Sequence, residues 1–176
     1  MFIAGLFKEN TFIENVFILL LTAIFWPCVM LLISYLSYLT KVKRRQNILS
    51  QSPFNKLSEI GFGTYPLHQD DKWQFTEMVP VVTWKNYEIL MDVESRPIGY
   101  QIKFLAMVEN SKIDEKRFSE LHEFFTRKDM AFDFGGVSMY VKPKSITEIN
   151  QIKESLDQLT SILENEFFTP AKTRLL

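Results

Sequence analysis

One stretch divides the chain, residues 16–45, with the sequence VFILLLTAIFWPCVMLLISYLSYLTKVKRR. Residues 16–40 carry no charged side chain, whereas four of the next five residues are basic. A helix of about 25 residues is about 38 Å long, more than the roughly 30 Å of hydrocarbon in a bilayer. Since a helix satisfies its own backbone groups in lipid, the stretch predicts one membrane-spanning helix over residues 16–40.

Other functions of an apolar N-terminal segment fit this sequence less well. A cleaved signal peptide has a basic start, a shorter apolar core and a small-residue cleavage site, and these features are missing here. A lipoprotein cysteine follows small residues, whereas Cys28 follows Phe25, Trp26 and Pro27. A core helix of a soluble domain shows a polar stripe, which this segment lacks.

The basic residues beside the span predict its direction. Lys41, Lys43, Arg44 and Arg45 flank its C-terminal end, against Lys8 on the other side. Since Lys and Arg near a span are retained in the cytoplasm, we expect a single-pass protein with its N-terminus outside. The predicted organisation is an outer tail (1–15), the transmembrane helix (16–40), a basic linker (41–53), a cytoplasmic domain (54–170) and a short tail (171–176).

Charge and cysteine content narrow the function of the domain. Residues 46–176 hold 15 basic and 19 acidic side chains, so they lack the clustered positive charge of a nucleic-acid-binding surface. The single cysteine lies in the apolar segment, which excludes a disulfide framework or a multi-cysteine metal site within one chain.

The first half of the domain predicts a short helix and three strands. Residues 54–61 form the helix, which Gly61 ends. The strand at 73–84 contains Pro80, which lacks an N–H group, so we expect it at a sheet edge or a bulge. Residues 87–94 alternate as a half-buried strand, and residues 100–109 are apolar on both sides, as in a central strand.

The second half predicts a helix, a hairpin and a second helix. Residues 111–129 have helical apolar spacing, and Gly135-Gly136 separates two strand-like runs as a hairpin loop. After a possible capping box at Ser145 and Glu148, apolar residues recur at helical spacing, and they are Ile149, Ile152, Leu156, Leu159 and Leu163. This stripe is either the cover of the domain's own sheet or a coiled-coil seam.

The predicted order of elements is α-β-β-β-α-β-β-α over residues 54–168, an α+β domain with an antiparallel sheet. In this order the domain resembles the type III secretion chaperones. The resemblance implies a twisted antiparallel sheet, a long final helix, and binding of partner polypeptides without catalysis.

The residues that could carry chemistry are few. Asp133-Phe134-Gly135 is better explained as a hairpin turn than as a kinase metal motif. His68, Asp70 and Asp71 could ligate a metal in one loop, and His122 fits the margin of a core. We therefore predict no catalytic residue, no cofactor and no metal.

The sequence favours a membrane-anchored, non-catalytic protein-binding domain of the adaptor, chaperone-like or immunity type. We expect its partners to be the lipid bilayer and a protein, or a second copy of the chain, and no nucleic acid. The expected contact surface is the strand around Pro80 or an aromatic patch of Trp73, Trp84 and Phe124. The alternatives are a structural subunit that binds through its transmembrane helix and, third, a small metal-dependent hydrolase that uses the His68 loop.

Overall fold

The computed structural model describes residues 12–67, 77–97, 99–110, 113–133 and 135–171. The chain forms two compact units, Met1–Arg44 and Arg45–Leu176. The first contains most of helix α1 (Phe12–Leu49), and the second contains the last turn of α1 and every other element described.

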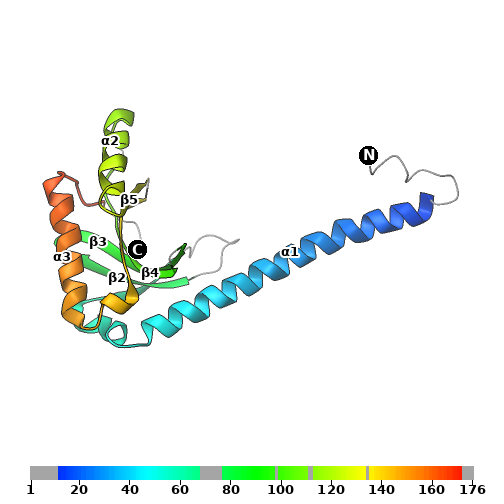
Figure 1. Ribbon diagram of the computed structural model, residues 1–176, viewed down its shortest axis with the longest axis horizontal. Helices are drawn as coiled ribbons and strands as arrows, with labels where there is room; N and C mark the ends of the chain where they lie inside the picture. Colours follow the sequence, from blue (N-terminus) through cyan, green and yellow to red (C-terminus); the bar gives the residue numbers. More distant parts are fainter. Residues whose placement is uncertain (1–11, 68–76, 98, 111–112, 134, 172–176) are drawn as a thin grey trace. The chain divides into compact units, whose positions relative to one another are not determined.

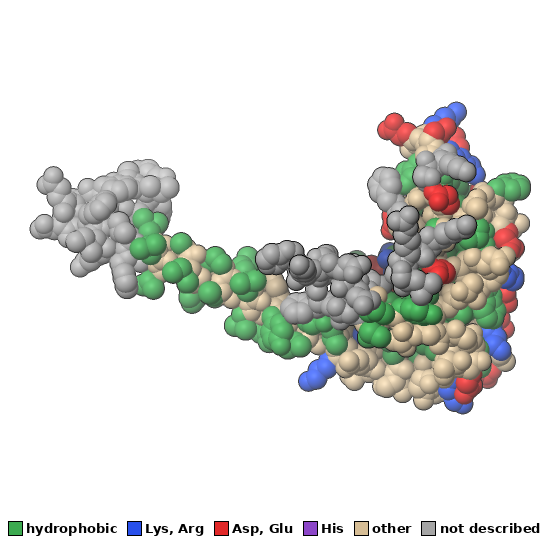
Figure 2. All heavy atoms as spheres, turned by 180° about the vertical axis from the view of Figure 1, so that it is seen from behind, with side chains coloured by type: hydrophobic (Ala, Val, Ile, Leu, Met, Phe, Trp, Pro, Cys, Tyr) green, Lys and Arg blue, Asp and Glu red, His purple; other side chains and the backbone are tan. Residues whose placement is uncertain are grey.

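Helix α1 continues through Pro27 without a break (Figure 1). Within the described residues, its part from Leu19 to Leu49 is the one helix long and apolar enough to cross a membrane, and none of its most apolar window is buried. Figure 2 shows hydrophobic side chains along the described part of α1, whereas most charged side chains lie on the second unit. Length and composition thus allow α1 to be a membrane anchor, and a signal sequence passes the same criteria.

The second unit is built on an open, six-stranded antiparallel sheet with the order β1-β2-β3-β4-β6-β5. Four strands come first in the chain, and two follow helix α2 (Glu115–Thr126). The strands are β1 (Gly63–Leu67), β2 (Glu77–Trp84), β3 (Tyr87–Arg96), β4 (Gly99–Ala106), β5 (Met130–Asp133) and β6 (Gly136–Val141). The short helix η1 (Phe54–Ile60) precedes the sheet, and η2 (Pro143–Ser145) and α3 (Ile149–Asn165) come after it. The predicted α+β class is confirmed, as is the central position of β4, which pairs with β3 and β6.

Helix α3 covers one face of this sheet. Alternate residues of β3 are buried, and Met91 and Val93 pair with Phe104 and Ile102 of β4 on the same face. Four residues of the predicted apolar stripe of α3 are fully buried, namely Ile152, Leu156, Leu159 and Leu163. Burial of each such side chain stabilises the fold by about 1.5–3 kcal/mol. Of the two predicted alternatives, the stripe is therefore the cover of the domain's own sheet.

Helix α2 packs on β5 at the far end of the sheet, where aromatic rings form the core. Phe125 of α2 lies 5.9 Å from Phe132 of β5 and 5.9 Å from Phe168, measured between ring centroids. The helix begins after Asp114, whose carboxylate accepts a hydrogen bond from the Arg117 backbone N–H at 2.7 Å. This N-cap satisfies one of the free N–H groups at the helix start.

The sheet contains a strand that the sequence did not predict, β1, which lies beyond β2. Strand β1 pairs with β2 from Glu77 to Val81, so β2 is not the outermost strand of the sheet. Residues 77–80 pair with β1 alone, which agrees with the edge or bulge predicted at Pro80. Pro80 is tolerated because the pairing of β2 with β3 runs only from Val81 to Trp84. The β2–β3 ladder therefore loses no hydrogen bond through the absence of an N–H group at Pro80.

The predicted hairpin holds with a shift of one residue, whereas the capping box predicted at Ser145 and Glu148 is wrong. Asp133 pairs with Gly136, so the predicted hairpin closes over residues 134–135. Helix α3 begins after Glu148, whose N–H donates to Oε1 of Gln151 at 3.1 Å. Ser145 instead ends the separate turn η2, because Pro143 starts that turn.

The last turn of α1 belongs to the domain. Ile48 and Leu49 pack against its core, and Nη2 of Arg45 lies 2.8 Å from Oδ1 of Asp92 on β3. The Arg45 side chain is 8% exposed, whereas Lys41 and Lys43 are exposed. Of the basic residues predicted to set topology, Arg45 therefore also forms part of the folded domain.

Candidate functional site

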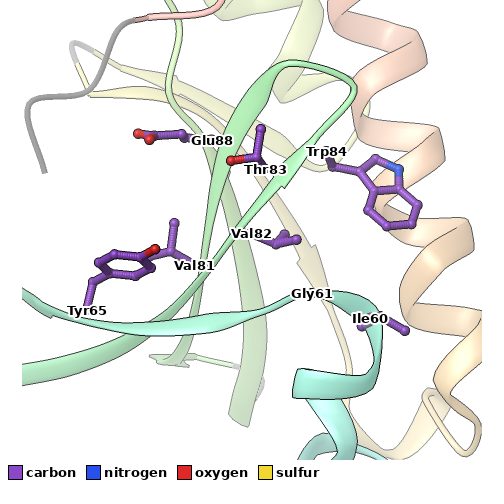
Figure 3. Close-up of a pocket in the computed structure, with 8 residues that line it drawn as sticks. All are labelled: Ile60, Gly61, Tyr65, Val81, Val82, Thr83, Trp84 and Glu88. Atoms are coloured by element: carbon purple, nitrogen blue, oxygen red, sulfur yellow. The ribbon is translucent and has the colours of Figure 1, made fainter. Parts of the chain in front are cut away.

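The candidate site is a cavity of about 430 Å³ beside the C-terminal end of β2 (Figure 3). Pairing between β1 and β2 begins at Gly63 and Val81, so the last three residues of β2, Val82–Trp84, extend past the end of β1. The cavity occupies this open edge, and its described lining residues are Ile60, Gly61, Tyr65, Val81, Val82, Thr83, Trp84 and Glu88.

The chain before β1 explains why the edge is left open. Gly61 has a φ of 90°, in the left-handed region, and ends η1. The next residue, Phe62, is buried in the core, and its N–H donates to the carbonyl of Leu57 at 3.2 Å. Because glycine adopts this conformation at little cost, the chain turns at Gly61 and enters the sheet only at Gly63, opposite Val81.

The backbone of Thr83 faces the open edge. The β2–β3 hairpin closes with Trp84 paired to Tyr87, and its two loop residues, Lys85 and Asn86, have φ values of 46° and 72°. In such a two-residue hairpin the closing pair exchanges hydrogen bonds, and hydrogen-bonded pairs alternate along the ladder. The N–H and C=O of Thr83 therefore point away from β3, and no described residue provides a backbone partner for them.

Strand β2 separates the cavity into two sides of different chemistry. Figure 3 shows Tyr65, Val81 and Glu88 on one side of the strand, with the Thr83 hydroxyl directed to it. Val82, Trp84 and Ile60 lie on the other side, which faces α3. The first side is polar and the second is apolar.

Hydrogen bonds to α3 hold the Trp84 ring in place. Its indole N–H donates to Oδ1 of Asp157 at 3.0 Å, and Nζ of Lys85 lies 3.1 Å from the same oxygen. The hydrogen bond from Trp84, followed by the contacts of Lys85, lowers the pKa of the Asp157 carboxyl below its usual value. At neutral pH Asp157 is therefore ionised and the indole ring is fixed as one wall of the cavity.

Glu88 provides the charge on the polar side of the cavity. It is the cross-strand partner of Thr83, and the two side chains share one face of the sheet. Its Oε2 atom is buried and makes no hydrogen bond with any described residue. Because a buried acceptor without a donor is costly, this oxygen is suited to receive a donor from a ligand.

The residues predicted as a contact surface occupy different places. Trp84 lines the candidate site. Pro80 lines a neighbouring cavity of about 300 Å³ together with Met78 and Phe54. Phe124 is half-buried on α2, with Nζ of Lys128 4.3 Å from its ring centroid, and Trp73 lies outside the described residues.

Two residues that the sequence offered as candidates for chemistry, His122 and Asp133, make hydrogen bonds that stabilise the fold. Nδ1 of His122 lies 3.1 Å from the carbonyl oxygen of Phe132, which joins α2 to β5. Asp133 accepts a hydrogen bond from the N–H of Gly135 at 2.8 Å, within the predicted hairpin. Among the described residues no group of three or more His, Cys, Asp or Glu side chains could hold a metal, and His68, Asp70 and Asp71 lie outside them.

The chain shows no match to protein families, to curated proteins or to solved structures. The resemblance to type III secretion chaperones rests on element order alone, and strand β1 departs from that order.

Proposed function

We propose that this chain is a single-pass membrane-anchored protein whose cytoplasmic domain binds an extended segment of a partner protein along the open edge of β2. The observation that carries this proposal is the backbone of Thr83, which is directed into a cavity with no backbone partner among the described residues. An extended peptide can add to such an edge as a further strand, with main-chain hydrogen bonds for affinity and side-chain contacts for specificity.

The membrane anchor is supported by the apolar surface of α1. Large apolar side chains from Leu19 to Leu39 are exposed, and water is an unfavourable environment for so large an apolar surface. A bilayer covers these side chains, and the basic residues after the span keep the domain in the cytoplasm. Anchoring also raises the effective concentration of the domain near membrane-associated partners.

Photo-crosslinking in cells tests the proposed binding edge. A benzophenone amino acid replaces Thr83 in the full chain, and a matched variant carries it at Ser161, an exposed residue of α3. We expect a discrete adduct from position 83 and none from position 161. Equal labelling from the two positions, or no adduct from position 83, contradicts the proposal.

Exchange of the span separates this proposal from binding through the transmembrane helix. Residues 16–40 are replaced by a leucine-rich span of equal length, with the basic border retained. The adduct at position 83 persists if the domain makes the specific contact, and it is lost if the span does. A reporter fused after Leu176 tests the orientation, because it is active in the cytoplasm only if the domain lies there.

A further inference from the structure

Glu88 is the one charged residue among the described residues that line the cavity beside β2. Its carboxylate lies on the polar side with the hydroxyl of Thr83 and the ring of Tyr65 (Figure 3). A carboxylate pairs most strongly with a cationic donor, through a charge-assisted hydrogen bond. The chemistry of this side therefore favours a ligand with a positively charged group.

The geometry of strand addition specifies which residue of the ligand faces Glu88. A residue that pairs with Thr83 places its side chain on the same face as Thr83, and Glu88 lies on that face in the next strand. Two strand spacings, roughly 9–10 Å, then separate the backbone of the incoming residue from that of Glu88. The long flexible stem of Lys or Arg spans this gap, whereas the side chain of Ser, Thr or His is too short.

The residues on either side of that basic residue face the opposite way. Side chains alternate along a strand, so its neighbours point to the side formed by Ile60, Val82 and Trp84 (Figure 3). That side is apolar, and the hydrogen bond to Asp157 fixes the Trp84 ring there. Apolar side chains at these positions lose water on binding and gain contact with the indole ring.

We infer that the segment bound at the β2 edge reads apolar–basic–apolar in an extended conformation, with its Lys or Arg paired to Glu88. This inference rests on the proposed strand-addition function and adds the class of partner sequence. An acidic segment is rejected, because its carboxylate would lie beside that of Glu88.

A peptide-binding assay tests this inference. The probe is the fluorescein-labelled pentapeptide valine–arginine–valine–arginine–valine, blocked at both ends, and its neutral counterpart carries citrulline in place of arginine. Full-length protein in phosphatidylcholine nanodiscs is titrated, and binding is measured by fluorescence anisotropy. Since the lipid is zwitterionic, attraction of the basic peptide to the membrane is small.

We expect the arginine peptide to bind at least tenfold more tightly than the citrulline peptide. Glu88→Gln removes the charge with little change of shape, so the ratio falls to about one. Thr83→Arg places a guanidinium opposite Glu88. The affinity ratio again falls to about one, because Glu88 is then already paired within the protein. The control Glu154→Gln, on the exposed surface of α3, keeps the tenfold ratio.

The outcomes separate this inference from the function on which it rests. If both peptides bind equally and Glu88→Gln changes neither affinity, the inference that the partner segment is basic is wrong, whereas strand addition remains supported. An arginine preference that persists in Glu88→Gln places the charge recognition elsewhere and also overturns the inference. If neither peptide binds and position 83 forms no adduct, the proposed function itself fails.

Discussion

The ion pair between Arg45 and Asp92 predicts a difference between two neighbouring basic residues. Arg45→Met removes the guanidinium that lies 2.8 Å from Asp92, and leaves a side chain of similar length. Lys43→Met removes a charge from the same border at an exposed position. Both variants weaken the basic border equally, so only the contribution to the fold distinguishes them.

The expected cost follows from the burial of the two partners. Loss of one member of a fully buried pair costs about 3–5 kcal/mol. The Asp92 side chain is 34% exposed, and its Oδ1 also accepts a hydrogen bond from the N–H of Val93. Since Asp92 is partly solvated and keeps that donor, we expect Arg45→Met to lower the free energy of unfolding by about 2 kcal/mol. Lys43→Met is expected to change it by less than about 0.5 kcal/mol.

Urea unfolding of the full chain in non-ionic micelles measures this difference. A loss of about 2 kcal/mol lowers the urea midpoint by about 1 M when the m value is about 2 kcal/mol/M. In a double-mutant cycle with Asp92→Asn, we expect a coupling energy of at least about 1 kcal/mol. Equal midpoints for the two methionine variants, or a coupling near zero, would refute a stabilising role of the pair.

Three further predictions concern stability and pH. Phe167 follows α3 with a φ of 59°, in the left-handed region, and its side chain is 90% exposed. Because glycine adopts this conformation at little cost, Phe167→Gly should raise the free energy of unfolding by about 0.5–1 kcal/mol, whereas Phe167→Ala should not. A Cβ atom at Gly136 would lie 2.1 Å from the carbonyl oxygen of Ala106. Gly136→Ala should therefore lower the free energy of unfolding by more than about 2 kcal/mol, and an unchanged urea midpoint would contradict this close approach. Burial, and then the charge of Glu164, raise the pKa of Tyr87, so the stability that this shift contributes is present below about pH 10 and is lost as pH rises through the folded-state pKa. Tyr87→Phe should lose the hydrogen bond to the Phe168 carbonyl oxygen, at a cost of about 1 kcal/mol at neutral pH, and should show a smaller fall of the urea midpoint above pH 10.

Side-chain periodicity predicted the buried face of the covering helix α3 and that of strand β3 within the sheet. The apolar stripe of α3 and the alternation of β3 follow from which side of a helix or strand each residue occupies, and the structure confirms both. Strand β1 has no such signal, because its five residues include Gly63 and Pro66 and a polar run comes after them. Pairing with β2 makes it a strand.

The candidate site could be predicted only in part for the same reason. Trp84 is predicted in a contact surface and lines the cavity, whereas the sequence pattern does not single out Thr83 or Glu88. Their importance depends on where β1 stops, which the turn at Gly61 and the burial of Phe62 decide. A residue pattern along one strand contains no information about the length of its neighbour.

Three features can be read from the order of neighbouring residues alone, namely the long apolar segment, its basic border and the α+β class of the domain. The pairing of Arg45 with Asp92, and the extension of β2 past β1 beside Glu88, became visible only in the folded chain. The ion pair joins residues far apart in the sequence, and the open edge of β2 depends on where the separate strand β1 begins, so both are decided by how whole elements pack against one another.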